Sequence, residues 1–282
     1  MCARNQKGIC GAMRFNFAAL AAVLLAPGVC AAGDFLPGKN LFRPFIADPT
    51  QPSYNVRLTA PAGVGRLAEI NMGDELGLAA WETPSGKLQL GVMGGVAARF
   101  DISRVTNDFQ IADFSLAFPV DYKTGPWELR AMYWHTSSHL GDDYVKSRDL
   151  QPSTLQKHVT DDFRALASFA VSDRFRVYGG AACAFNIIPS DAGKHMLHGG
   201  TEFFFGPESA TKKTRPFFLA ADLQSWQRVS WNPSFTARAG IRAKGQQQAL
   251  SGYVEFFSGQ LLYLGLMPQH ETHWALGFNF EL

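Results

Sequence analysis

The chain has 282 residues, of which 46% are hydrophobic and 13% are aromatic. This composition is ample for a folded core and excludes a largely disordered protein. With 26 basic and 24 acidic residues the formal charge is only +2, and no dense run of Lys or Arg occurs. The sequence therefore gives no indication of nucleic-acid binding.

The first 32 residues have the pattern of a secretory signal peptide. Arg4, Lys7 and Arg14 precede an apolar stretch, residues 15–26, and small residues follow up to Ala32. The apolar stretch is too short to stay in a membrane as a spanning helix. We therefore expect export through the inner membrane, with cleavage after Ala32.

The rest of the chain is dominated by alternating apolar and polar residues. No later apolar run has the length of a transmembrane helix, whereas a period of two is the pattern of β-strands. The clearest alternating segments are residues 87–100, 109–122, 127–138, 163–171, 175–187, 217–223, 235–243, 250–256 and 274–282, and weaker ones are 54–60, 76–81 and 196–205. The sequence predicts an all-β fold of about twelve strands.

Three features favour a transmembrane antiparallel β-barrel over a soluble sandwich, which also alternates. Most of the clearest segments are about nine to fourteen residues long, as bilayer-crossing strands are, rather than the five or six usual in soluble sheets. Their second face carries many charges, as expected for a polar lumen, and aromatic residues cluster at strand ends, where membrane interfaces lie. The charged set includes Glu128, Arg130, Arg164, Arg176, Asp222, Arg238 and Arg242.

The connections alternate between short turns and long loops. Long ones are expected at residues 62–74, 101–108, 139–161, 226–234 and 258–272. Short periplasmic turns and long outer loops are typical of outer-membrane barrels, in which an even strand number leaves both termini on the periplasmic side. We therefore assign residues 33–53 to an N-terminal periplasmic segment and 54–282 to the barrel.

A group of chemically active side chains lies on the segment from Trp127 to Tyr144. His135 and Ser137 fall on the same strand face as the apolar residues before them, which would meet lipid near the outer rim. A base and a hydroxyl two residues apart could act as a nucleophilic pair, and Asp149 and Asp161 are the acids placed to orient the base.

The other polar groups singled out in the sequence are a motif directly after Ser137 and a pair of histidines. Ser138, His139, Gly141 and Asp142 form a motif that could simply shape a loop. The spacing His195-x-x-His198 would place ligands on one face of a helix, but on a strand it directs them to opposite faces, so we predict no metal centre there. No cofactor motif occurs, and only calcium stays open as an assisting ion, at Asp142 and Asp143.

The His-x-Ser pair resembles that of the outer-membrane phospholipases and lipid A deacylases. In those families the pair lies on the outer barrel wall, with a third residue that orients the histidine, which implies a role for His135 and Ser137 here. An acid twelve residues after the serine matches the spacing of those families and points to Asp149. Ser138 departs from the Asn that usually follows their serine.

A wider resemblance covers nearly the whole mature chain. The stretches FLPGKNLFRPFIADPTQP and HTSSHLGDDY are similar to those of a family of Gram-negative envelope proteins catalogued as domain of unknown function 1207. This resemblance implies an outer-membrane barrel. The terminal stretch WALGFNFEL also resembles the C-terminal signal that the barrel assembly machinery recognises, so that machinery is an expected partner.

Two classes of function follow from these observations. In the first, the chain is an outer-membrane hydrolase that acts on acyl esters of phospholipid or lipopolysaccharide in the outer leaflet. In the second, it is a non-enzymatic barrel, either a narrow pore or a structural component of the envelope. Both place the protein in the cell outer membrane, in contact with its lipids.

Overall fold

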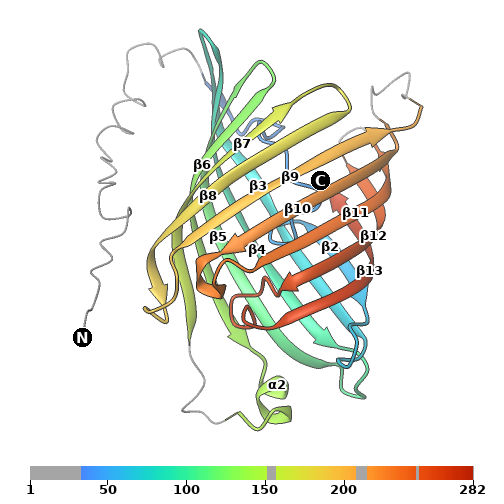
Figure 1. Cartoon of the computed structure of the whole chain (residues 1–282). Helices are drawn as coiled ribbons and strands as arrows, with labels where there is room; N and C mark the ends of the chain where they lie inside the picture. Colours follow the sequence, from blue (N-terminus) through green and yellow to red (C-terminus); the bar gives the residue numbers. More distant parts are fainter. Residues whose placement is uncertain (1–32, 151–156, 208–214, 246–247, 282) are drawn as a thin grey trace.

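A computed structural model describes residues 33–150, 157–207, 215–245 and 248–281, which form a ring of twelve long antiparallel strands (Figure 1). Each strand pairs with the next along the chain, and pairing of β13 with β2 closes the ring. The strands are β2 (Tyr54–Thr59), β3 (Leu67–Thr83), β4 (Gly86–Asp101), β5 (Asp108–Thr124), β6 (Trp127–Leu140), β7 (His158–Ala170), β8 (Phe175–Ile188), β9 (His195–Phe205), β10 (Phe217–Trp226), β11 (Pro233–Lys244), β12 (Ala249–Gln260) and β13 (His270–Glu281). The predicted all-β barrel is confirmed.

The smaller elements lie outside this ring. The two-residue strand β1 (Asp34–Phe35) pairs with β3, helix α2 (Asp142–Ser147) follows β6, and the 3-10 turn η3 (Gln227–Val229) follows β10. None of the helices in the described part of the chain has the length and apolar character needed to cross a membrane.

The two faces of the wall differ as the alternation predicts. On β6, Trp127 and Leu129 are 44% and 38% exposed, whereas Glu128 and Arg130 are 2% and 3% exposed. Because successive side chains of a strand point to opposite faces, apolar residues cover the outside and charged residues fill the lumen.

Some strand boundaries differ from those expected. The predicted long loop at 62–74 is mostly strand, because β3 begins at Leu67 and runs through Gly73 and Asp74. Gly and Asp are common in turns, so these two residues suggest a turn in the sequence. In the structure, the missing side chain of Gly73 lets the wall lie close to Pro52, because a Cβ atom at Gly73 would be 2.9 Å from the proline side chain. The loops after β6 and β12 are also shorter than expected, because β6, β7, β12 and β13 all extend further than the apolar alternation.

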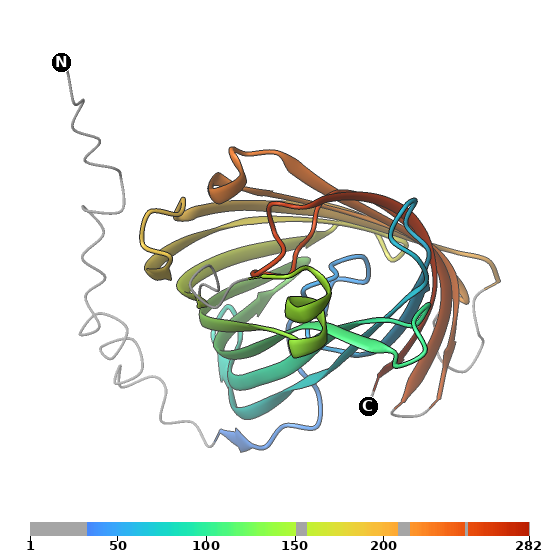
Figure 2. The same cartoon turned by 90° about the horizontal axis from the view of Figure 1, so that it is seen from below.

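The segment that precedes β2 enters the barrel rather than trailing from it (Figure 2). Arg176 donates hydrogen bonds to the carbonyls of Arg43 and Pro44 at 3.1 and 2.8 Å, and the Ile46 amide donates to Glu202 Oε1 at 2.8 Å. Phe45 stacks on Tyr178 with ring centroids 3.7 Å apart. Residues 39–50 therefore form a plug in the lumen, and we use the name N-terminal plug for them.

The loop between β12 and β13, residues 261–269, covers the lumen from the opposite end. The backbone amides of Leu264 and Gly265 donate to Asp113 Oδ2 at 2.7 Å and to Ser138 Oγ at 3.1 Å. Tyr263 is buried in this loop, and desolvation raises the pKa of its phenol. A cavity of about 80 Å³ lies between this loop and the N-terminal plug, which leaves room for a few water molecules only.

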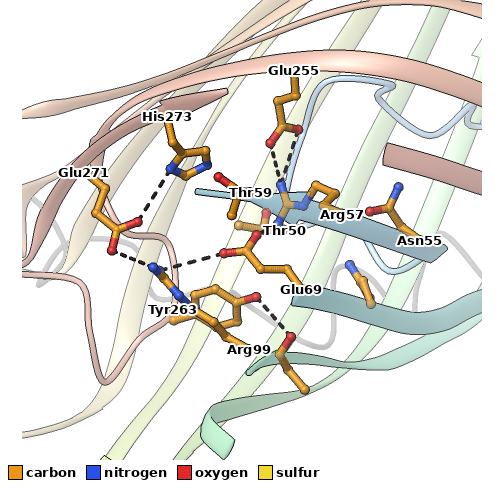
Figure 3. Close-up of polar contacts among 12 residues, drawn as sticks. Thr50, Asn55, Arg57, Thr59, Glu69, Arg99, Glu255, Tyr263, Glu271 and His273 are labelled. Carbon is orange, nitrogen blue, oxygen red and sulfur yellow. Dashed lines mark hydrogen bonds and ion pairs between the residues drawn. The ribbon is translucent and has the colours of Figure 1, made fainter. Parts of the chain in front are cut away.

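Ion pairs occupy the lumen between the two closures. Arg57 lies 2.6 Å from Glu69 and 3.0 Å from Glu255, and Arg99 lies 2.5 Å from Glu271 (Figure 3). Because a buried charge without a partner costs several kcal/mol, roughly 3–5 when one partner is removed, these networks tie the strands to one another.

Candidate functional site

Four polar side chains gather on the outward face of β6, β7 and β8, near the end of the barrel that carries α2. Tyr133 and His135 come from β6, Asp161 from β7 and Asn186 from β8. His135 is opposite Asp161 in the strand register, and Asp161 is opposite Asn186. Three neighbouring strands thus place these groups side by side on a wall whose other outward residues are largely apolar.

Asp161 is the centre of the group. His135 Nδ1 lies 2.7 Å from Asp161 Oδ1, and the Tyr133 hydroxyl donates to the same oxygen at 2.7 Å. Asn186 Nδ2 donates to the other oxygen, Oδ2, at 2.6 Å. A carboxylate on Nδ1 fixes the orientation of the imidazole and leaves Nε2 free to accept a proton.

Ser137 lies two residues beyond His135 on the same face, as the sequence predicts. It pairs in register with Phe114 on β5 and Val159 on β7. Within the described residues its hydroxyl makes no hydrogen bond, so it is available to a ligand. Residues two apart on a strand are about 6.6 Å apart along it, a span that an imidazole and a hydroxyl can bridge together.

The two candidate acids lie in different places. Asp161 contacts His135 directly, whereas Asp149 lies beyond α2 with a left-handed backbone (φ 49°) and its amide bonded to the Lys146 carbonyl at 3.2 Å. The structure brings His135, Ser137 and Asp161 to one face and leaves Asp149 in the loop.

The motif after Ser137 has mainly structural contacts. Ser138 points into the lumen, where its hydroxyl donates to Asp113 and accepts the Gly265 amide, while His139 lies outside against the Phe114 ring, 5.7 Å between centroids. A Cβ atom at Gly141 would lie 2.0 Å from the Phe109 carbonyl oxygen. Asp142 opens the first turn of α2. These residues shape the corner where β6 meets the loop.

Sequence reasoning missed Tyr133 and Asn186 as members of the site. Tyr133 appeared to be one more aromatic residue of the lipid-facing wall. Asn186 was hidden by a register shift between Asp161 and Asp162 in the pairing of β7 with β8, which alternation along one strand does not reveal. A polar residue directly after the outward Phe185 was the available signal.

Comparisons with known proteins place this geometry in context. A family model described as protein of unknown function (DUF1207) matches residues 15–262, and the chain belongs to that family. A search of curated proteins found no match.

Solved barrels share the fold. The outer membrane phospholipase of Salmonella typhi, a dimer with bound calcium, superposes with a TM-score of 0.52 at 13% identity, covering 85% of this chain and 94% of that one. Outer membrane phospholipase A from Escherichia coli gives 0.51 at 13% identity, with 83% and 93% covered. The KdgM porin gives 0.47 at 11% identity, with 82% and 99% covered. At these identities the phospholipases show a common barrel fold and no more.

Proposed function

We propose that this member of the DUF1207 family is an outer-membrane hydrolase that cleaves acyl esters of lipids in the outer leaflet. Ser137 is the nucleophile, His135 the base and Asp161 the residue that orients the base. The observation that carries the proposal is the 2.7 Å contact of His135 Nδ1 with Asp161 on the outward wall, two residues from a free serine hydroxyl.

The free-energy cost of polar side chains that face lipid supports a functional role for the group around Asp161. Polar side chains that face lipid are costly, so a carboxylate, an imidazole, a phenol and an amide gathered on an outward face need a reason. Their mutual hydrogen bonds reduce the cost but leave Nε2 and the Ser137 hydroxyl without partners in the described structure. A site for a polar reaction on a lipid substrate supplies that reason.

The chemistry follows the general pattern of serine hydrolases. Ser137 Oγ attacks the acyl carbonyl carbon as His135 Nε2 takes its proton, and the imidazolium gains stability from Asp161. The alcohol of the lipid leaves with that proton, and the acyl group stays on Ser137. Water activated by His135 then releases the fatty acid and restores the hydroxyl.

The location belongs to the same proposal. A signal peptide, residues 1–32, lies outside the described residues and would direct export. Residues 33–53 would then enter the lumen from the periplasmic side, and the barrel assembly machinery would recognise the C-terminal strand. Membrane lipids are the immediate neighbours of the outward wall and supply the substrate.

The test is release of fatty acid from phospholipid and from lipopolysaccharide in detergent micelles, with and without calcium. We expect Ser137→Ala and His135→Ala each to abolish release, with effects that do not add because the pair acts as a unit. Ser258→Ala is the matched control, because Ser258 is another outward serine near the same end of the barrel, with Phe256 two residues before it. Folded wild-type protein that releases nothing, or an active Ser137 variant, would refute the proposal.

A second candidate is a closed structural barrel without enzymatic activity. The filled lumen favours it over the porin alternative, since the N-terminal plug and the 261–269 loop leave a cavity of only about 80 Å³ between them. It would be preferred if neither lipid is hydrolysed.

A further inference from the structure

A second group of reactive side chains lies inside the lumen, apart from the outward site. Asp48 comes from the N-terminal plug, His198 from β9 and Asp222 from β10. They are 8%, 8% and 1% exposed, respectively. The plug thus meets the barrel wall at a buried cluster of one imidazole and two carboxylates.

The donor atoms of this cluster converge on one point. His198 Nε2 lies 2.6 Å from Asp222 Oδ2 and 3.9 Å from Asp48 Oδ2, and all three ligand atoms lie within 4.8 Å of one another. Ligands bound to zinc at about 2.0–2.2 Å in a tetrahedral arrangement are roughly 3.3–3.6 Å apart. The observed spacings lie on either side of this value, so small rotations of the side chains would complete a coordination shell.

No arginine or lysine pairs with the two carboxylates of the cluster among the described residues. Asp48 Oδ1 accepts hydrogen bonds only from neutral donors, namely the amide and hydroxyl of Thr50 and the Gln224 amide, and Asp222 accepts from Tyr178 and Gln224 besides His198. The nearby Arg164 is already paired with Asp162 at 2.8 Å. The two carboxylates therefore lie in a buried setting, where such groups are costly unless a cation is beside them.

One buried oxygen at the cluster also lacks a hydrogen bond. Among the described residues, Gln224 Oε1 is fully buried without a partner, although the amide nitrogen of the same side chain contacts both carboxylates. A buried acceptor without a donor is destabilising. A cation would give this oxygen a partner, with Gln224 turned so that Oε1 faces the ion.

We propose that Asp48, His198 and Asp222 form a binding site for a divalent transition-metal ion, with the neighbouring Gln224 as a fourth ligand that donates through its oxygen. One imidazole with carboxylate oxygens suits zinc better than calcium or magnesium, which prefer oxygen ligands alone. The ion would fasten the plug to the wall of the barrel. Of the two histidines spaced His195-x-x-His198, only His198 takes part, because the other ligands come from the plug and from β10.

The experiment measures zinc on the full-length protein, refolded into detergent with Zn²⁺ and then desalted. We expect one zinc ion per chain by elemental analysis. Asp48→Asn and His198→Gln should each weaken binding by on the order of tenfold or more. His195→Gln is the matched control, because it removes an imidazole from the same strand outside the cluster, and it should keep the full stoichiometry. The shift between boiled and unboiled samples on a gel verifies that each variant is folded.

A second measurement tests the fastening role. Chelation should increase cleavage of the plug by an added protease in the wild type and in His195→Gln, but should change nothing in Asp48→Asn. A folded wild type without zinc, or zinc retained by both cluster variants, would show that the cluster is only a hydrogen-bonded contact and would overturn the proposal.

Discussion

Asp161 receives hydrogen bonds from Tyr133 and Asn186 in addition to its contact with His135, which makes it the best-positioned acid of the outward site. If it orients the base, Asp161→Asn should lower lipid esterase activity by roughly 10⁴-fold, since an amide stabilises the wrong imidazole tautomer. Asp149→Asn should leave activity unchanged. The measurement is the rate of fatty acid release, and equal losses in both variants would contradict the assignment of Asp161.

Gly141 is a position where the backbone leaves no room for a side chain. A Cβ atom there would meet the Phe109 carbonyl oxygen at 2.0 Å, so Gly141→Ala must displace the corner between β6 and α2. We expect the free energy of unfolding to fall by about 1–3 kcal/mol. The measurement is the temperature to which a sample must be heated before half of it runs as unfolded protein on a gel, and this midpoint should be lower in the variant. Gly38→Ala is the control, because nothing lies within 4 Å of its added Cβ atom. An unchanged midpoint for Gly141→Ala would show that the corner yields freely.

At the scale of an element, the 261–269 loop is held by hydrogen bonds from two strands. Ser138→Ala would leave the Gly265 amide without its acceptor and Asp113 Oδ1 without its donor, at a cost of about 1–3 kcal/mol. Cleavage of this loop by an added protease should become faster, with the barrel itself intact. Ser137→Ala, which removes the neighbouring outward hydroxyl and no hydrogen bond of the described residues, should not alter it. A loop as resistant in Ser138→Ala as in the wild type would mean that its other contacts, such as the bond from Leu264 to Asp113 and the packing of Leu261 and Tyr263, are enough to hold it.

The strands were predictable because each one separates an apolar face from a polar face, and this leaves a period of two in the sequence. Where that contrast weakens, prediction failed. β3 contains Gly73 and Asp74 near its middle, and because these residue types are common in turns, the first half of the strand was predicted as a loop. Its pairing with β4 shows that it is a strand. His135 and Ser137 could be paired from one strand, but their neighbour Asn186 depends on an irregular register between two others.

The N-terminal plug shows what the sequence does not encode locally. Residues 39–50 have no periodicity, and Pro44 and Pro49 discourage regular structure. Their place in the lumen depends on partners far along the chain, such as Glu128 for Arg43 and Glu202 for Ile46. Contacts of such separation are a property of the closed barrel, and alternation within a strand carries no information about them.

For the whole molecule, closure at both ends predicts little or no steady current in planar bilayers. The plug packs Phe42 and Phe45 in the lumen, and the 261–269 loop covers the opposite mouth. Twelve strands enclose a lumen that side chains and such segments can largely fill. Large and reproducible open-channel currents from purified wild-type protein would contradict this prediction and favour a pore.

Removal of the plug tests the cause of the closure. A variant without residues 39–50 loses the ring stack on Tyr178 and the carbonyl acceptors of Arg176, so water and ions should enter from that end. We expect currents above the wild-type level once the 261–269 loop is shortened as well, because either closure alone blocks the path. The matched control replaces the exposed loop 102–107 with a short Gly-Ser turn. It should give no current, because this loop extends into solvent, with Val105 fully exposed. A silent double variant that folds would show that the ion pairs of the wall, such as Arg57 with Glu69 and Glu255, are enough to close the barrel.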